Sequence, residues 1–220
     1  MHLWVFSDQP QRFKNMPHFG IINSTCKSGS AVHIQKHALG YENLLDDRDI
    51  QQIELLVIHC TELPDLATAR SYGEVIHYSS GTGNSGHYYV DRNGEVHQWV
   101  KPEKVAHHVR GHNKQSVGIE LINSGRYPDW HDSRQQVPTE AYPDEQITAL
   151  VALIKFLQVK LPNLKHIAGH EDLDQNKIPA TNDPAVKILR KIDPGPLFPW
   201  DHVMQQINLI NIGSHAKKYE

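Results

Sequence analysis

The chain has 220 residues, of which 39% are hydrophobic and 21% are charged, so it is long and apolar enough to bury one core. Lysine and arginine total 22 against 25 for aspartate and glutamate, and a net charge of −3 gives no basic field for nucleic acid or an anionic membrane. No apolar run approaches the roughly 18 residues that a membrane span needs. We therefore expect a globular protein with one main domain.

The chain begins with a segment that lacks regular patterning. Over residues 1–50, brief apolar stretches alternate with prolines, glycines and serines, which predicts an irregular arm. The first residues show no charged region ahead of an apolar one, so we expect no export signal and a cytoplasmic protein. Cys26 and Cys60 are too few for a disulfide framework and are predicted to be free thiols.

An apolar run then predicts the first core strand. Leu55 to Ile58 is a continuous stretch of strand-forming residues that ends at His59. Residues 64–78 carry Asp65 at their start and scattered apolar residues, which predicts a short helix, and the glycine-rich residues 79–86 read as a loop. His59 is therefore expected at the end of a buried strand.

Two further strand signals follow. Residues 87–100 hold two strand-like stretches around Asn93-Gly94, a pair that tolerates the positive φ of a tight turn, so we predict an antiparallel hairpin. Residues 116–122 predict another strand, in which Glu120 points away from the alternate apolar residues. Those apolar residues are Val117, Ile119 and Leu121.

The second half of the chain alternates helix and strand signals. Residues 143–161 show apolar residues at helical spacing with acidic residues in the first turn, and residues 165–168 read as a strand ending at Gly169-His170. Residues 185–191 are a second candidate helix. We predict an α/β domain over residues 51–205, built on a single mixed central β-sheet flanked by helices, and a C-terminal tail over 206–220.

A candidate metal site emerges from three of these positions. The chain has 16 histidines, so a lone histidine is more readily a core or surface residue than a ligand. His59 and His170, however, both end predicted strands, and with Asp193 they offer two imidazoles and one carboxylate. This donor set suits Zn²⁺ and leaves one tetrahedral position open for water. Asp183, which precedes a proline, is the alternative third ligand.

The order of these segments resembles the zinc-dependent N-acetylmuramoyl-L-alanine amidases that share a fold with peptidoglycan recognition proteins. The resemblance runs from about Leu55 to Trp200. It rests on short segments in the family's order, namely Val57-Ile58-His59-Cys60-Thr61, Ser85-Gly86-His87-Tyr88, Ala106-His107-His108, Val117-Gly118-Ile119-Glu120-Leu121, Gly169-His170-Glu171 and Lys191-Ile192-Asp193-Pro194-Gly195-Pro196. It implies His59, His170 and Asp193 as zinc ligands.

The resemblance also implies an activity and its catalytic groups. The reaction would be hydrolysis of the amide between the lactyl group of N-acetylmuramic acid, or its anhydro form, and L-alanine of peptidoglycan or a muropeptide. Glu120 is the candidate general base and then general acid. Lys191 lies two residues before Asp193, on the same side of an extended segment, and can offer positive charge to the oxyanion; an ordinary surface lysine is the alternative.

Three residues are expected to contact the substrate. They are Thr61, His108 and Arg190, the last through bidentate contacts with the acidic stem peptide. A structural role for His108 and a solvated position for Arg190 are the alternatives. We expect the protein to act as a monomer. The competing class is a peptidoglycan-binding recognition module without catalysis, but such modules typically lack a metal ligand, and all three are present here.

The sequence departs from the family pattern in three places. The spacing between His170 and Asp193 is longer than family members usually show, which implies an insertion over residues 176–188 that overhangs the site. His107 replaces the family's usual tryptophan, which alters a pocket wall. Gly86 stands where some members place a catalytic tyrosine, so Glu120 is the remaining candidate base.

Overall fold

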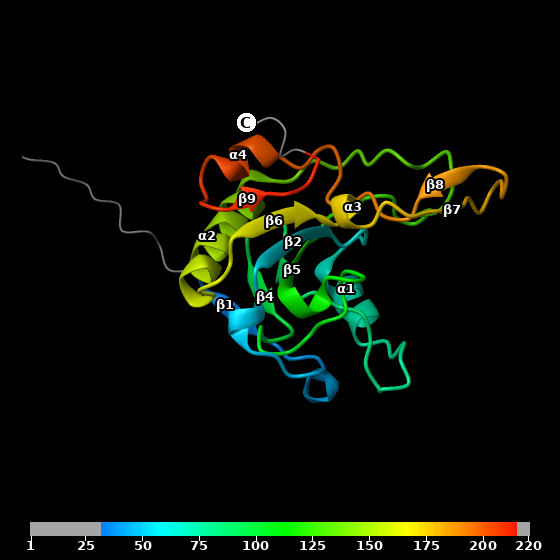
Figure 1. Cartoon of the computed structure of the whole chain (residues 1–220). Coiled ribbons are helices and arrows are strands. Elements are labelled where there is room, and N and C mark those ends of the chain that lie inside the picture. Colours follow the sequence, from blue (N-terminus) through cyan, green and yellow to red (C-terminus); the bar gives the residue numbers. More distant parts are fainter. Residues whose placement is uncertain (1–31, 215–220) are drawn as a thin grey trace, which may run out of the picture.

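The computed structural model describes residues 32–214, and its centre is a seven-stranded sheet in the order β1-β4-β3-β5-β2-β6-β9 (Figure 1). Neighbouring strands run parallel except for the β3/β4 hairpin, which is antiparallel as predicted. The strands are β1 Ile34–Lys36, β2 Leu55–Cys60, β3 Tyr88–Val90, β4 Val96–Gln98, β5 Ser116–Leu121, β6 His166–Gly169 and β9 Ile210–Asn211. The predicted α/β fold with a mixed central sheet is confirmed.

The helices are α1 Leu66–Gly73, α2 Asp144–Lys160, α3 His170–Leu173 and α4 Trp200–Met204, with short 3-10 turns at Glu42–Leu44, Ile50–Gln52 and Asn113–Gln115. Helix α2 matches the predicted helix to within a residue at each end, because its apolar face is continuous and acidic residues occupy its first turn. Helix α1 is shorter than predicted and ends at Gly73. Within residues 32–214, no helix has the length and apolarity to cross a membrane.

The alternation of side chains along β2 decides which face of the sheet carries the site. Leu56, Ile58 and Cys60 belong to the main core cluster, which also contains the buried face of α2. Leu55 and Val57 point to the opposite face and pack with Val109 and Ala168. Burial of each large apolar side chain contributes about 1.5–3 kcal/mol. His59 therefore emerges on the face opposite α2.

Both ends of the described region contribute more to the sheet than the sequence predicts. The expected irregular arm contains β1, which pairs with β4, and Leu39, Tyr41 and Leu45 are buried in a second cluster with Trp99. The expected tail contains β9, which pairs with β6. The sequence missed both edges because two- and three-residue strands are too short to show a period. Residues 1–31, the rest of the predicted arm with Cys26, lie outside the described residues.

The predicted helix over residues 185–191 is wrong. Strand β8, Lys187–Leu189, pairs antiparallel with β7, Lys177–Pro179, in a separate two-stranded sheet. Ile188 is buried while its two neighbours are exposed, which is the period of a strand. Figure 1 shows this hairpin projecting beyond α3, away from the central sheet. The insertion inferred between His170 and Asp193 is thus the β7-β8 hairpin.

Candidate metal centre and its cavity

Three buried side chains converge at one end of the sheet. His59 lies in β2, His170 is the first residue of α3, and Asp193 follows the β7-β8 hairpin; each is 2% exposed. Asp193 Oδ2 lies 3.1 Å from Nδ1 of His59 and 3.1 Å from Nδ1 of His170. Because Ile58 pairs with Gly169 across the parallel strands, the residues that follow them emerge side by side. In the described part of the chain, these three form a group whose ligand atoms lie within 4.8 Å of one another.

A hydrogen-bond relay orients the His59 ring. His59 Nε2 lies 3.0 Å from His108 Nδ1, and His108 Nε2 lies 3.2 Å from Ser116 Oγ. The Ser116 hydroxyl donates to the carbonyl of His112 at 2.7 Å, so it accepts from His108, and His108 in turn accepts from His59. Burial lowers the pKa of His59 to about 4, so the ring is neutral and its Nδ1 carries a lone pair.

The lone pair on His59 Nδ1 shows whether a cation fits between the three side chains. His59 Nδ1 faces a carboxylate oxygen at 3.1 Å, and two acceptors that face each other repel unless a cation lies between them. Tetrahedral zinc with bonds of about 2.0–2.1 Å would separate two ligand atoms by about 3.3 Å. Nε2 of His170 and Oδ1 of Asp193 are also buried without a hydrogen-bond partner. The donor set and its spacing therefore fit Zn²⁺.

Glu120 stands beside this group because of strand register. It pairs with His59 across β2 and β5, so both side chains point to the same face, and its Oε1 lies 4.0 Å from His59 Nδ1. Burial raises the pKa of Glu120 to about 8, and the nearby Asp193 adds to this rise. Gly86 makes room for the carboxylate, since a Cβ there would lie 2.7 Å from Glu120 Cγ.

Lys191 supplies a positive charge beside Asp193. Its Nζ lies 3.9 Å from Asp193 Oδ1, and its side chain is 30% exposed. Burial alone would raise the pKa of Asp193, but His170 and Lys191 outweigh burial and hold that pKa well below its usual range. Asp193 is therefore an anion in the folded protein, as a metal ligand must be.

The candidate site opens into a cavity of about 540 Å³. Thr61 and His108 line it beside the metal group, but His108 is committed to the relay with His59, and the Thr61 hydroxyl donates to the carbonyl of Asn123 at 3.3 Å. His107 forms part of the wall and packs against Tyr78, with ring centroids 4.8 Å apart. The remaining polar lining includes His77, Asn84, Arg110 and Asn113.

The inserted hairpin separates the two candidate third ligands. Asp183 lies in its exposed turn and accepts from the backbone N–H of Ala185 at 3.0 Å, away from both histidines.

Arg190 lines the cavity and forms an ion pair with the buried Asp174 at the base of the hairpin. Its guanidinium therefore already has a protein partner.

Two buried residues near the site gave no signal in the sequence. Glu62 and Arg126 form an ion pair in which Arg126 Nε lies 2.6 Å from Glu62 Oε1. They stand 64 positions apart and belong to no motif, so only the folded chain brings them together.

Fold and site together define a class: an α/β protein whose buried two-histidine, one-carboxylate group opens into a cavity beside a carboxylate and an amine. The profile of the Amidase_2 family, described as N-acetylmuramoyl-L-alanine amidase, matches residues 49–196, which is more than half of the chain. The chain belongs to this family.

Individual relatives agree with this assignment. N-acetylmuramoyl-L-alanine amidase AmiD of Escherichia coli is 30% identical over 171 residues, which are 70% of this chain and 53% of AmiD, so the chain spans about half the length of that relative. A solved complex of E. coli AmiD with anhydro-N-acetylmuramic acid-L-Ala-D-gamma-Glu-L-Lys is 28% identical, with a TM-score of 0.51 over 70% of this chain and 57% of that one.

More distant structures share the fold alone. An AmpD derivative is 23% identical with a TM-score of 0.57, over 79% of this chain and 94% of AmpD. The Clostridium intestinale endolysin LysCS, an N-acetylmuramoyl-L-alanine amidase, is 17% identical with a TM-score of 0.52, over 83% of this chain and 99% of that one.

Proposed function

We propose that this protein is a zinc-dependent N-acetylmuramoyl-L-alanine amidase that hydrolyses the amide between the muramoyl or anhydromuramoyl lactyl group and L-alanine. The observation that carries the proposal is the convergence of His59, His170 and Asp193 beside Glu120 in one cavity. Membership of the amidase family supports the bond type, and the anhydromuramoyl peptide bound to AmiD supports the substrate class.

In this proposal His59, His170 and Asp193 hold the ion. A bound zinc ion would lower the pKa of a water molecule and polarise the scissile carbonyl. The positive charge of a bound zinc ion would favour the ionised form of Glu120 despite its burial. Glu120 then accepts a proton from the attacking water and later donates it to the amine nitrogen of the leaving L-alanine. Its position beside His59 supports this role, which typically contributes about 10²–10⁴-fold to the rate.

Lys191 and the cavity wall complete the proposed mechanism. The ammonium group of Lys191 stabilises the negative charge that develops on the scissile carbonyl oxygen. Thr61 and the exposed part of Arg190 contact the substrate, while His108 acts through His59. We also propose that the protein acts as a monomer, because residues of one chain form the whole candidate site.

The test combines metal analysis with product identification. Purified full-length protein should contain about one zinc per chain, and it should release the free stem peptide from anhydromuropeptides or from intact peptidoglycan, as read by mass spectrometry. A chelator should abolish release, and added Zn²⁺ should restore it. Binding of muropeptide without zinc and without hydrolysis would instead assign the protein to the non-catalytic recognition class.

A further inference from the structure

The end of β2 has an unusual backbone immediately after the His59 region. Glu62 has a φ of 52°, in the left-handed region that residues other than glycine seldom adopt. Its neighbours are fixed on both sides, because the Thr61 N–H donates to Leu121 and the Leu63 N–H donates to Asn123, at 3.0 and 3.1 Å. Such a conformation persists only where surrounding contacts determine it.

Those contacts come from Arg126 and Trp130. Arg126 Nε and Nη2 donate to the two carboxylate oxygens of Glu62 at 2.6 and 2.9 Å, and Trp130 Nε1 donates to the Glu62 carbonyl at 2.8 Å. Gly125 allows this close approach, since a Cβ there would lie 2.7 Å from Glu62 Cγ. Both charged side chains are buried, with 1% of Arg126 and 9% of Glu62 exposed.

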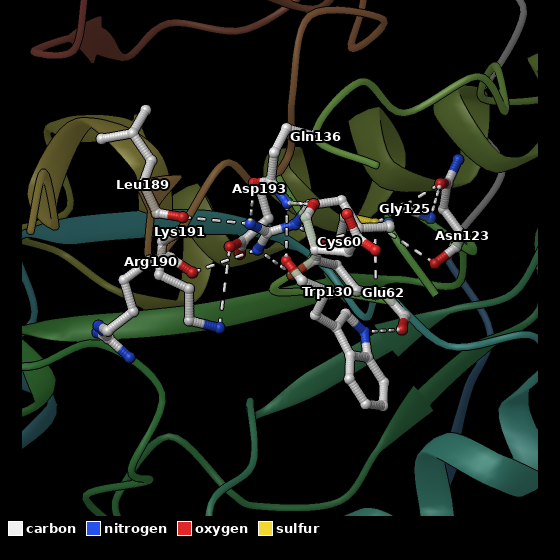
Figure 2. A network of polar contacts seen from close by, with 12 residues as sticks. Cys60, Glu62, Asn123, Gly125, Trp130, Gln136, Leu189, Arg190, Lys191 and Asp193 are labelled. Atoms are coloured by element: carbon white, nitrogen blue, oxygen red, sulfur yellow. Dashed lines mark hydrogen bonds and ion pairs between the residues drawn. The ribbon is translucent and has the colours of Figure 1, made fainter. Parts of the chain in front are cut away.

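The same guanidinium also reaches the segment that carries Lys191 and Asp193. Arg126 Nη1 donates to the Leu189 carbonyl and Nη2 to the Arg190 carbonyl, both at 3.2 Å. A further bond from Nη1 to Gln136 Oε1, at 2.9 Å, accounts for the fifth N–H of the group. Figure 2 shows Glu62, Gln136 and the Leu189, Arg190 and Lys191 backbone gathered around this network.

We propose that Arg126 is a positioning residue for the candidate metal centre. It joins the end of β2 to the returning strand of the inserted hairpin and so holds Asp193 and Lys191 against His59. The proposal rests on the proposed zinc-amidase function, which it deepens. A lysine cannot replace Arg126, because an ammonium group has three donors on one atom and cannot span Glu62 and two carbonyls at once.

The test compares R126K with R134K in the full-length protein. Arg134 lies in the same loop, is 74% exposed and pairs only with Asp132 among the ion pairs of the described residues, so R134K makes the same chemical change without touching the network. The Zn²⁺ dissociation constant is measured on metal-free protein by competition with a chromophoric chelator, and kcat and KM are measured separately on an anhydromuropeptide.

We expect R126K to weaken Zn²⁺ binding and to lower kcat, each by about 10–100-fold, with KM within about threefold of the parent value, as is usual when a support of a metal ligand is lost. R134K should match the parent protein within twofold. A folded R126K with unchanged Zn²⁺ affinity and kcat, even if less heat-stable, would overturn the proposal because its role would then be structural only.

A second variant covers the case in which R126K does not fold. E62Q keeps the length of the side chain but removes the charge that Arg126 pairs with, so we expect Zn²⁺ binding to weaken by about threefold to tenfold; no weakening would overturn the proposal. Parent protein that binds Zn²⁺ but hydrolyses nothing would contradict the proposed function while the affinity comparison stands. Parent protein that binds no Zn²⁺ would overturn both.

Discussion

The candidate site has two halves that are held in place by different means. His59, His170 and Glu120 lie at or next to strand ends, where parallel register places them side by side. Lys191 and Asp193 follow the β7-β8 hairpin, and hydrogen bonds from a buried arginine hold the backbone ahead of them. A sheet fixes side chains through many repeated backbone bonds, whereas a returning loop depends on a few specific side chains. We therefore expect substitutions to affect the two halves differently.

The largest effect should come from removing the ligand of the loop half. Asp193→Ala takes away one of three ligands, so Zn²⁺ affinity should fall by at least about 100-fold and hydrolysis should be lost with it. Asp183→Ala is the matched control, because Asp183 lies in the exposed hairpin turn. Chelator competition and product assays measure both. If Asp183→Ala were the damaging change, the third ligand would have been misassigned.

A change in the sheet half should separate catalysis from metal binding. Glu120→Gln keeps the shape of the side chain but cannot accept the proton of water, so kcat should fall by about 10²–10⁴-fold while zinc content stays at about one per chain. Metal analysis and single-substrate kinetics on the same preparation provide the measurement. Near-normal turnover in this variant would leave Glu120 without its proposed role.

A smaller change tests how closely the sheet half is packed. Gly86→Ala would place a Cβ 2.7 Å from Glu120 Cγ and 3.2 Å from its Oε1, which must push the carboxylate aside. We expect kcat to fall by about tenfold, because a displaced carboxylate accepts the proton less efficiently. Zn²⁺ affinity should stay unchanged, because the substitution does not touch the three ligands. Gly40→Ala, whose Cβ would meet its nearest atom at an ordinary 3.6 Å, serves as the control. Equal losses in the two variants would indicate a general effect of added methyl groups.

The smallest expected effect concerns His87, which bonds to the strand that carries Glu120. His87 is fully buried, its Nδ1 accepts from the Gly118 N–H at 3.1 Å, and its Nε2 lies 2.8 Å from Arg48 Nη2. Burial, aided by the charge of Arg48, holds the pKa of His87 well below 6.5, so the folded state keeps it neutral while the unfolded chain binds a proton below about pH 6.5. Stability should therefore fall as pH drops below that value, by up to about 1.4 kcal/mol per pH unit for this residue.

Urea unfolding at pH 7, 6 and 5 measures that dependence. His87→Gln should be less stable at pH 7. Its free energy of unfolding should fall less steeply with decreasing pH, because unfolding of this variant takes up about one proton fewer. If the free energy of unfolding of the two proteins changed with pH at the same slope, His87 would not contribute to the loss of stability in acid.

The sequence predicted the strands of the sheet half well, and it also named Asp193 and Lys191, but it assigned the wrong secondary structure to the hairpin ahead of them. Strand β2 and helix α2 are long enough to show a period, and the turn at Gly94 marks the hairpin, so the positions of His59, Glu120 and His170 followed from local patterns. The roles of these residues stay predictions until they are tested. The convergence of their side chains depended on strand order, which the resemblance implied and the periodicity did not.

The errors have physical causes. Residues 185–191 were predicted as a helix, but their strand depends on pairing with Lys177–Pro179, a contact outside the segment. Strand β1 is too short to show a period, and its place in the sheet depends on β4. The pair of Glu62 and Arg126 is not visible in the sequence, because each looks like an ordinary charged residue until folding buries both.

The alternation of side chains along β2 also places the imidazole of His59 and the thiol of Cys60 on opposite faces of the sheet. Cys60 adjoins His59 in the chain, yet its sulfur lies on the other face of the sheet, where it contacts Asn123, and burial strongly raises the pKa of the thiol. It therefore offers no thiolate to alkylating reagents or peroxide. Nor does it present a soft ligand to copper or cadmium at the candidate centre, whose nitrogen and oxygen donors favour borderline cations. Among the described residues, Cys60 should thus not make the activity sensitive to thiol-modifying inhibitors, whereas chelators should abolish it.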